Sequence, residues 1–282
     1  MSVNITATEI NKLRQQTGAG MMDCRKALVE SEGDFEAAID YLRKKGQKVA
    51  ALRGDREAKE GVVIAKTTSD NKTGFIITLA CETDFVSKNA DFVAFAQSIM
   101  DAGVAANVNS VEELNALSLD GATVSDRVND QVAKIGEKIS VTRFEKVTAN
   151  AVAAYIHGSY RMGVLVGLSS DSAEAISAGK DVAMQIAAMN PVAVDAASVP
   201  TETVERERAI VTDQISADPK MAGKPADMIA KIAEGKLNAF FKEQTLLAQA
   251  YVKDNGKSVA DYLKSVDPSL KVTEFKRVAL GA

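Results

Sequence analysis

Several residue types on which common protein functions depend are scarce or missing in this sequence. Its 282 residues include no tryptophan, two cysteines and one histidine, and aromatic residues make up only 5%. The lone His157 excludes a histidine-rich metal site, while Cys24 and Cys81 lie far apart and form neither a CxxC motif nor a disulfide framework. We therefore expect a core of Ala, Val, Ile and Leu and a reducing, cytoplasmic environment.

Strong positive charge and long apolar runs are also absent. The net charge is −4, and hydrophobic residues make up 46% of the chain. An acidic balance argues against broad electrostatic binding to nucleic acid, and the hydrophobic content suits packed domains, roughly two to three at this length. The sequence predicts no signal peptide and no membrane span, so neither nucleic acid nor a membrane is an expected partner.

The motifs of common enzymes are missing as well. The sequence has no GxxxxGK[ST] phosphate loop, no HExxH motif and no GxSxG motif. Glu82 and Asp84 could share an acidic corner, but acids this close at a strand end are mostly solvated, and no supporting group accompanies them. We expect no catalytic residue, no metal and no cofactor; a small-molecule enzyme using these two acids is the less favoured alternative.

Residues 1–46 are predicted to form a three-helix domain, and a charged linker that is helical at its start follows at 47–60. Thr6 and Glu9 have the spacing of a capping box, while Ile5 and Ile10 stand where a hydrophobic staple would place them. Apolar residues then recur at helical spacing in three stretches separated by glycines. A module near the lower size limit for independent folding usually offers a loop or a helix face to another protein.

From Gly61 onward, short apolar strands alternate with helices, and residues 61–148 form the first half of the predicted core. The expected elements are strands at 62–66, 75–79 and 139–147, helices at 91–105 and 124–135, and a second capping box at Ser110–Glu113. The turn sequence at 69–74 joins the first two strands into a hairpin.

Phe85 stands on the connection between the strand that ends near Cys81 and the helix that begins near Asp91. Spacing alone favours a ring that folds back under this connection and joins the core. The alternative is an exposed ring that enters a partner, because side chains on such connections often face outward and aromatic residues are good interface anchors.

The order of elements then repeats, which predicts a duplicated α+β core. Residues 163–166 resemble 74–77, and residues 272–278 resemble 141–147. A third match pairs Asp181-Val182-Ala183-Met184 with Asp91-Phe92-Val93-Ala94. Each half would be a small antiparallel sheet with helices on one face.

A helical segment at 191–235 interrupts the second half, which we place at 149–190 and 236–282. The segment is polar, and the turn sequence at 218–225 predicts two antiparallel helices. Such a helical hairpin can pack on its own core, meet a second copy in a homodimer, or meet a different partner. The sequence leaves these three uses open.

Three stretches resemble signatures of bacterial-type translation elongation factor Ts. They are Thr17–Leu28, Cys81–Val86, and Ile156–Gly158 followed by Gly163–Leu165. The resemblance covers nearly the whole chain. It implies an N-terminal three-helix bundle like a ubiquitin-associated (UBA) domain, a duplicated α+β core, and a helical hairpin inserted in the second core half. It also favours the exposed alternative for Phe85.

Members of this family bind the GTPase elongation factor Tu and promote GDP release and exchange for GTP, without catalytic chemistry of their own. The resemblance implies that the segment Thr83, Asp84, Phe85 and Val86 disturbs the Mg²⁺ site of the GTPase. It implies supporting partner contacts for Ile135, His157, Val252, Met21 and Met22. The chain ends soon after its last predicted strand, so contacts of the C-terminal helix that some members append are not expected. A UBA-like adaptor without exchange activity is the alternative function.

Overall fold

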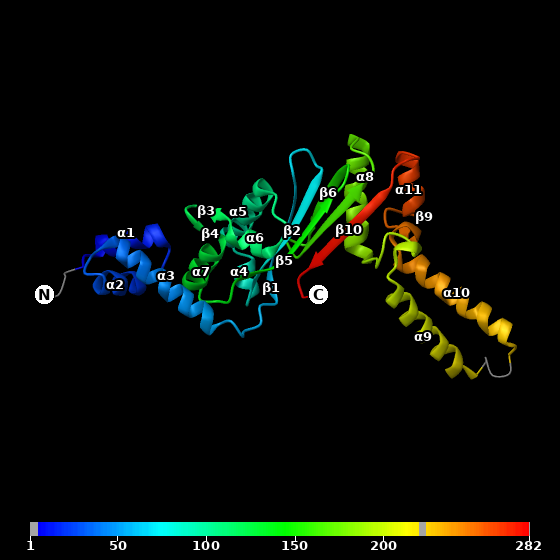
Figure 1. Cartoon of the computed structure of the whole chain (residues 1–282), viewed down its shortest axis with the longest axis horizontal. Helices are drawn as coiled ribbons and strands as arrows, with labels where there is room; N and C mark the ends of the chain where they lie inside the picture. The colour runs from blue at the N-terminus through cyan, green and yellow to red at the C-terminus, as the bar shows by residue number, and fades with distance from the viewer. Residues whose placement is uncertain (1–4, 220–223, 282) are drawn as a thin grey trace.

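The computed structural model describes residues 5–219 and 224–281. These residues form an elongated α+β molecule with eleven α-helices and several antiparallel sheets. The N-terminal helices lie at one end, two three-stranded sheets lie in the middle, and two long helices project at the other end (Figure 1). No helix in the described part of the chain is long and apolar enough to cross a membrane.

Three helices form the N-terminal region: α1 (Ala7–Thr17), α2 (Met21–Glu30) and α3 (Phe35–Leu52). The capping box predicted for α1 is confirmed, because the Glu9 carboxylate accepts from the N–H of Thr6 at 2.7 Å and the Thr6 hydroxyl accepts from the N–H of Glu9 at 3.3 Å. The apolar stripes of the three helices meet in a small core of buried residues: Leu13, Cys24, Ala27, Leu28, Ala38 and Leu42.

Helix α3 continues beyond this small core and joins the N-terminal region to the rest of the molecule. It packs along α7 (Val124–Ile135), where a Cβ added at Gly46 would lie 3.0 Å from the Cβ of Ala133. Val49 and Ala50, near the end of α3, pack against the core of the first sheet. The stretch predicted as a linker at 47–60 therefore begins as a packed helix, as its partly helical start implied, residues 53–59 lie outside helices and strands, and residue 60 begins the next strand.

The first half contains a three-stranded antiparallel sheet in the order β1-β2-β5. The strands are β1 (Glu60–Thr67), β2 (Thr73–Cys81) and β5 (Ser140–Thr148). Between β2 and β5 lie α4 (Asp84–Ser87), α5 (Ala90–Ala106), α6 (Val111–Ala116), the short strands β3 (Ser118–Leu119) and β4 (Ala122–Thr123), and α7. The predicted hairpin, third strand and two longer helices are confirmed, with ends that shift by a few residues.

The capping box predicted at Ser110–Glu113 forms only in half. The Ser110 hydroxyl accepts from the N–H of Glu113 at 3.1 Å, as expected. The Glu113 carboxylate, however, accepts from the N–H of Asn109 at 2.8 Å instead of that of Ser110. The reciprocal bond therefore reaches one residue further back than the motif predicts.

The second half has the same strand arrangement as the first. Its sheet has the order β10-β7-β6, built from β6 (Ala151–His157), β7 (Met162–Leu168) and β10 (Val272–Ala279). Helices α8 (Ala173–Met189) and α11 (Val259–Val266) contribute buried residues to the core on one face of this sheet. Four short elements also belong to this half: η1 (Ala196–Ser198), η3 (Leu246–Ala248), β8 (Ala250–Tyr251) and β9 (Asp254–Ser258).

The duplication extends to an irregularity in the third strand of each sheet. The register between β2 and β5 skips Thr142, and the register between β7 and β10 skips Thr273, which is the matching position of the repeat. The helical match does not correspond in the same way, because Asp91 lies in the first turn of α5 whereas Asp181 lies in the middle of α8. The strands therefore carry the repeat more faithfully than the helices.

The two sheets pack face to face, which explains the continuous apolar run in β2. Phe75 and Ile77 face the helices of the first half, while Ile76 faces the second sheet. Gly74 and Gly163 permit this close approach because they have no Cβ. A Cβ at Gly74 would lie 2.6 Å from Val152, and a Cβ at Gly163 would lie 2.9 Å from Val63, which is too close in both cases. The shared layer consists of one buried residue from each strand: Val63, Ile76, Val147, Val152, Leu165 and Val278.

Helices α9 (Thr201–Ala217) and α10 (Ala226–Gln244) pack along each other and project from the second half (Figure 1). Pro200 and Pro225 stand directly before them, at positions where a missing N–H costs the helix little. Helix α10 runs past residue 235, the predicted end of this segment, and stops at Gln244. The predicted turn at 218–225 lies partly outside the described residues.

Candidate functional site

The Thr83–Val86 segment forms a short helical turn at the end of β2. Residues Asp84–Ser87 are helical, and Thr83 occupies the N-cap position. The Phe85 side chain is 85% exposed, and it is the only exposed one of the nine phenylalanines, all of which lie among the described residues. The buried ring that spacing alone favoured is therefore wrong, and the exposed ring that the family resemblance favoured is confirmed.

The neighbours of Phe85 show why its ring points outward. Val86 packs against the core of the first half, and Ser87 is buried with its hydroxyl donating to the carbonyl of Asp84 at 3.2 Å. Successive residues of an α-helix are about 100° apart, so a turn that buries the third and fourth residues leaves the first two outside. Asp84 and Phe85 therefore lie together on the exposed side of α4.

Asp84 has a cationic partner of its own on the next turn. Lys88 Nζ donates to Asp84 Oδ2 at 2.6 Å, and this hydrogen bond lowers the pKa of the Asp84 carboxyl. The carboxylate is therefore ionised at neutral pH and stands beside the Phe85 ring.

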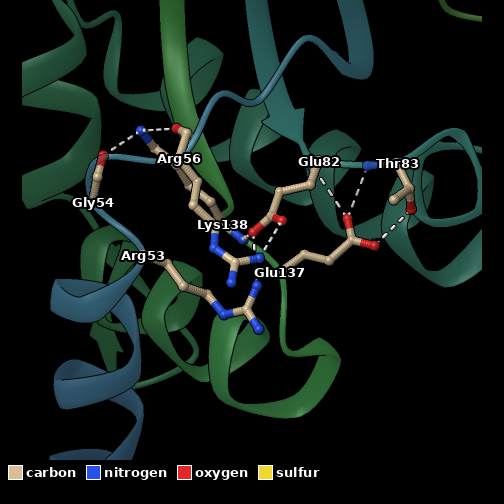
Figure 2. Close-up of polar contacts among 7 residues, drawn as sticks. All are labelled: Arg53, Gly54, Arg56, Glu82, Thr83, Glu137 and Lys138. Atoms are coloured by element: carbon tan, nitrogen blue, oxygen red, sulfur yellow. Dashed lines mark hydrogen bonds and ion pairs between the residues drawn. The ribbon is translucent and has the colours of Figure 1, made fainter.

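Glu82 faces in a different direction, toward the chain that follows α3. Its carboxylate pairs with Arg53 and Arg56, and the pKa of Glu82 falls to about 2, chiefly because the N–H of Lys138 donates to it (Figure 2). The two acids of the expected corner thus have separate partners, and neither holds the proton that a general acid needs. This geometry argues against the enzyme alternative.

Glu137 completes the site, and sequence reasoning missed it. Its carboxylate accepts from the N–H groups of Glu82 and Thr83 and from the Thr83 hydroxyl (Figure 2). In the sequence Glu137 is one of many acids, and its only mark is that it follows Gly136, the residue that ends α7. No local pattern links it to a segment more than 50 residues away.

Two of the implied supporting positions border this region. Ile135 ends α7 and packs against the core of the first half, just before the connection that binds Thr83. His157 is exposed at the end of β6. The turn after it reaches the first sheet, where the carbonyl of Tyr160 accepts from the N–H of Val63 at 2.7 Å. The structure thus brings Ile135 to the site and places His157 at the adjoining sheet edge.

The other implied positions lie in separate parts of the molecule. Met21 and Met22 are exposed at the start of α2, in the N-terminal region. Val252 is exposed in the turn between β8 and β9, and its N–H donates to Gln185 of α8 at 2.8 Å. Figure 1 shows α2 and β9 far apart along the molecule. The predicted residues therefore form separate patches instead of one continuous site.

The surface around Phe85 differs from a metal site or a ligand pocket within the described residues. Within the described residues, no three His, Cys, Asp or Glu side chains gather closely enough to hold a metal ion. A pocket of about 390 Å³ lies between the N-terminal helices and α7, but Phe85 does not line it. An exposed aromatic on a well-packed support is typical of a protein-binding surface, whereas ligand sites are concave and largely apolar.

Comparisons with known proteins identify the family. A family profile described as Elongation factor TS matches residues 82–282. Elongation factor Ts of Christiangramia forsetii is 51% identical over 277 residues, which cover 98% of this chain and 99% of that protein. The same factor from Flavobacterium psychrophilum is 49% identical over 277 residues, and that from Clostridium perfringens is 43% identical over 286 residues, 98% of this chain and 93% of that protein. The chain belongs to the elongation factor Ts family, a family of translation elongation factors.

Proposed function

We propose that this chain is a guanine nucleotide exchange factor for the GTPase elongation factor Tu. It binds the GDP form of the GTPase and promotes GDP release and exchange for GTP by disturbing the Mg²⁺ site, with Thr83–Val86 as the segment that enters the partner. Family membership supports this role, and the observation that carries it is the exposed Phe85 ring on α4. In this proposal the chain works in the cytoplasm and uses no catalytic chemistry or cofactor of its own.

The proposed mechanism needs only differential binding. Mg²⁺ bridges the nucleotide phosphates and the GTPase, so moving its protein ligands weakens nucleotide binding. A factor that binds the nucleotide-free state more tightly than the nucleotide-bound state shifts the equilibrium toward release. By linkage, a newly bound nucleotide then expels the factor to the same extent. The Phe85 ring supplies the volume that shifts the partner, and the ionised Asp84 repels nearby anionic groups or fixes the turn.

The proposal assigns a part to each region of the chain. The regions are a UBA-like domain at 1–46, a linker at 47–60, a first core half at 61–148, a second core half at 149–190 and 236–282, and an inserted helical hairpin at 191–235. The first half and the UBA-like domain face the nucleotide-binding domain of the GTPase, with Ile135, His157, Met21 and Met22 as supporting contacts. Val252 of the second half contacts another domain. Homodimerisation through 191–235 is a further role for the hairpin.

A second candidate function is a UBA-like adaptor without exchange activity. The exposed Met21 and Met22 favour it, because methionine surfaces adapt readily to partners. Deleting the N-terminal helices would not separate the two functions, since α3 packs on α7 and contributes to the core. The double variant Met21→Ala/Met22→Ala does separate them. An adaptor loses its partner, whereas the proposed exchange factor keeps most of its exchange activity through Phe85.

The decisive experiment is the release of fluorescent GDP from elongation factor Tu. Phe85→Ala should reduce the stimulated release rate about 30-fold, because truncating an aromatic anchor costs about 2 kcal/mol. Its free energy of unfolding should stay within about 0.5 kcal/mol of wild type, since the ring is exposed. Met189→Ala, at an apolar side chain of α8 that is 47% exposed, is the matched control. A wild-type release rate for Phe85→Ala refutes the proposed role of the ring.

A further inference from the structure

The helix that carries Phe85 is too short to set its own direction. Helix α4 has four residues, about one turn, and isolated helices of that length are unstable. Its N-cap residue, Thr83, is of a type whose hydroxyl usually accepts from an N–H of the first turn. Here no such bond is made. The direction of α4 must therefore come from groups outside the helix.

The core beneath Val86 and Ser87 supports the inner side of α4, and Glu137 supplies the polar contacts at its start. Its Oε2 accepts from the N–H of Glu82 at 3.1 Å and from the N–H of Thr83 at 3.0 Å, while its Oε1 accepts from the Thr83 hydroxyl at 2.6 Å (Figure 2). The Thr83 carbonyl accepts from Cys81 Sγ at 3.2 Å, and burial raises the pKa of this thiol to about 12, so it keeps its proton. One carboxylate thus fixes both the backbone and the side chain of the N-cap residue.

Glu82 closes the arrangement from the opposite side. Its Oε1 accepts from the N–H of Lys138 at 2.6 Å and from Arg53 at 2.8 Å, and its Oε2 accepts from Arg56 at 3.1 Å (Figure 2). Lys138 Nζ in turn donates to the carbonyls of Gly54 at 2.6 Å and Arg56 at 2.9 Å. We call these crossed carboxylates, Glu82 and Glu137, the carboxylate clamp. It joins the end of β2, the α7–β5 connection and the chain after α3.

The clamp begins where strand pairing stops. The last residue pair between β2 and β5 is Ala80 with Ser140, so no ladder hydrogen bonds hold the chain from Glu82 onward. We infer that Glu137 is a positioning residue, which acts through Thr83 to hold the Phe85 ring in the direction that engages the partner. This inference rests on the proposed exchange function. It differs from a purely stabilising role because it predicts an effect on exchange that disappears when the ring is removed.

A double-mutant cycle tests this difference. Glu137→Ala should slow stimulated GDP release about tenfold, since it removes charged hydrogen bonds worth on the order of 1.4 kcal/mol. In a Phe85→Ala background the same substitution should change the release rate by less than about twofold, because it acts through the ring. Glu137→Gln, which keeps an oxygen acceptor, should restore most of the rate. Glu145→Ala, at an acid that pairs with Lys276 across the two sheets, is the matched control and should behave as wild type.

Amide hydrogen exchange gives a readout that does not depend on GDP release. In Glu137→Ala the amides of residues 82–88 should exchange faster than in wild type, while those of β1 stay protected. The positioning role is overturned if amide exchange at 82–88 is unchanged. It is also overturned if the double variant shows the full loss of rate of Glu137→Ala multiplied by that of Phe85→Ala. A wild-type chain that fails to accelerate GDP release overturns the exchange function, and with it the positioning of the ring for the partner. Should Glu137→Ala not fold, Glu137→Gln takes its place in both measurements: its smaller loss of rate must still disappear in the Phe85→Ala background, and its amides at 82–88 must still exchange faster than in wild type.

Discussion

The two halves of the core hold their proposed partner-facing segments by different chemistry. In the first half, the carboxylate clamp holds the turn before Phe85 with charged groups near the surface. In the second half, the turn that carries Val252 is held by Gln185 of α8, an uncharged side chain that is completely buried. Both devices satisfy backbone N–H groups just beyond a strand. The fold is duplicated, but the group that binds the backbone of the exposed turn is a carboxylate in the first half and an amide in the second.

The second device is a completely buried amide on α8 with an ion pair beside it, in which Lys253 of the turn that carries Val252 donates to Asp181 of α8 at 2.6 Å. Gln185 Nε2 donates to Gln249 Oε1 and to the carbonyl of Ala250, both at 3.1 Å, and its Oε1 accepts from the N–H of Val252 at 2.8 Å. Beside it, the rings of Tyr251 and Tyr262 stack with centroids 4.2 Å apart. A buried amide with every group satisfied is costly to disturb but insensitive to pH, whereas the half-buried carboxylates of the clamp respond to pH.

The largest expected effect comes from the buried amide. Gln185→Ala removes a completely buried side chain and takes the partner from the buried Gln249 Oε1, the carbonyl of Ala250 and the N–H of Val252, so the free energy of unfolding should fall by about 3–5 kcal/mol. Urea unfolding of the full chain measures this loss. Gln97→Ala is the matched control, because Gln97 is exposed and makes one long hydrogen bond to Tyr160 at 3.3 Å. A loss below about 1 kcal/mol for Gln185→Ala would remove the contrast between the two halves.

A smaller effect, with a pH signature, is expected at the charged clamp. The folded-state pKa of Glu82 is about 2, below its ordinary value of 4.5, so the unfolded chain binds more protons at pH values between the two. Wild-type stability should therefore fall as the pH drops from about 5 toward 2. At neutral pH the free energy of unfolding of Glu82→Gln should be about 1–3 kcal/mol below that of wild type. It should also fall less steeply than that of wild type as the pH drops.

Equilibrium unfolding at a series of pH values checks the behaviour of Glu82→Gln. Gln185→Ala serves as the comparison variant, since removing an uncharged group should shift the whole stability curve without changing its slope in acid. If the free energy of unfolding falls with the same slope in acid for wild type and for Glu82→Gln, Glu82 does not supply the pH dependence.

The smallest effect is expected at the exposed ion pair beside Phe85. Lys88→Ala removes the partner of Asp84, and exposed ion pairs one helical turn apart contribute little to stability. The free energy of unfolding measured in urea should therefore stay close to that of wild type, and 1 M NaCl should abolish any difference. A loss as large as that of Glu82→Gln would mean that this pair belongs to the clamp instead of standing outside it.

Local contacts explain which parts of the fold could be predicted from the sequence. The hairpin of β1 and β2 follows from two apolar runs and a turn sequence, and the cap of α1 follows from Thr6 and Glu9, whose groups meet within one turn. The continuous apolar run in β2 indicated a buried strand. The second sheet, which covers one face of this strand, was not predictable because its residues lie far along the chain.

The candidate site was predictable in its residues but not in its geometry. The family signature indicated Thr83–Val86, whereas spacing alone favoured a buried Phe85. The ring is exposed because Val86 and Ser87 occupy the inner side of α4, which depends on the core beneath them. Glu137 and Gln185 escaped notice for the same reason. A polar residue that binds a distant backbone has the same local pattern as one that faces water.

The distance in sequence between the two sides of the clamp has a consequence for synthesis on the ribosome. Glu82 and Glu137 are 55 residues apart, and chains emerge from the N-terminus onward. A nascent chain that stops after α4 already contains the whole Thr83–Val86 segment but lacks the carboxylate that orients it. The segment can take its final form only after α7 and the connection to β5 have been made, so maturation of this surface lags behind the translation of its own residues.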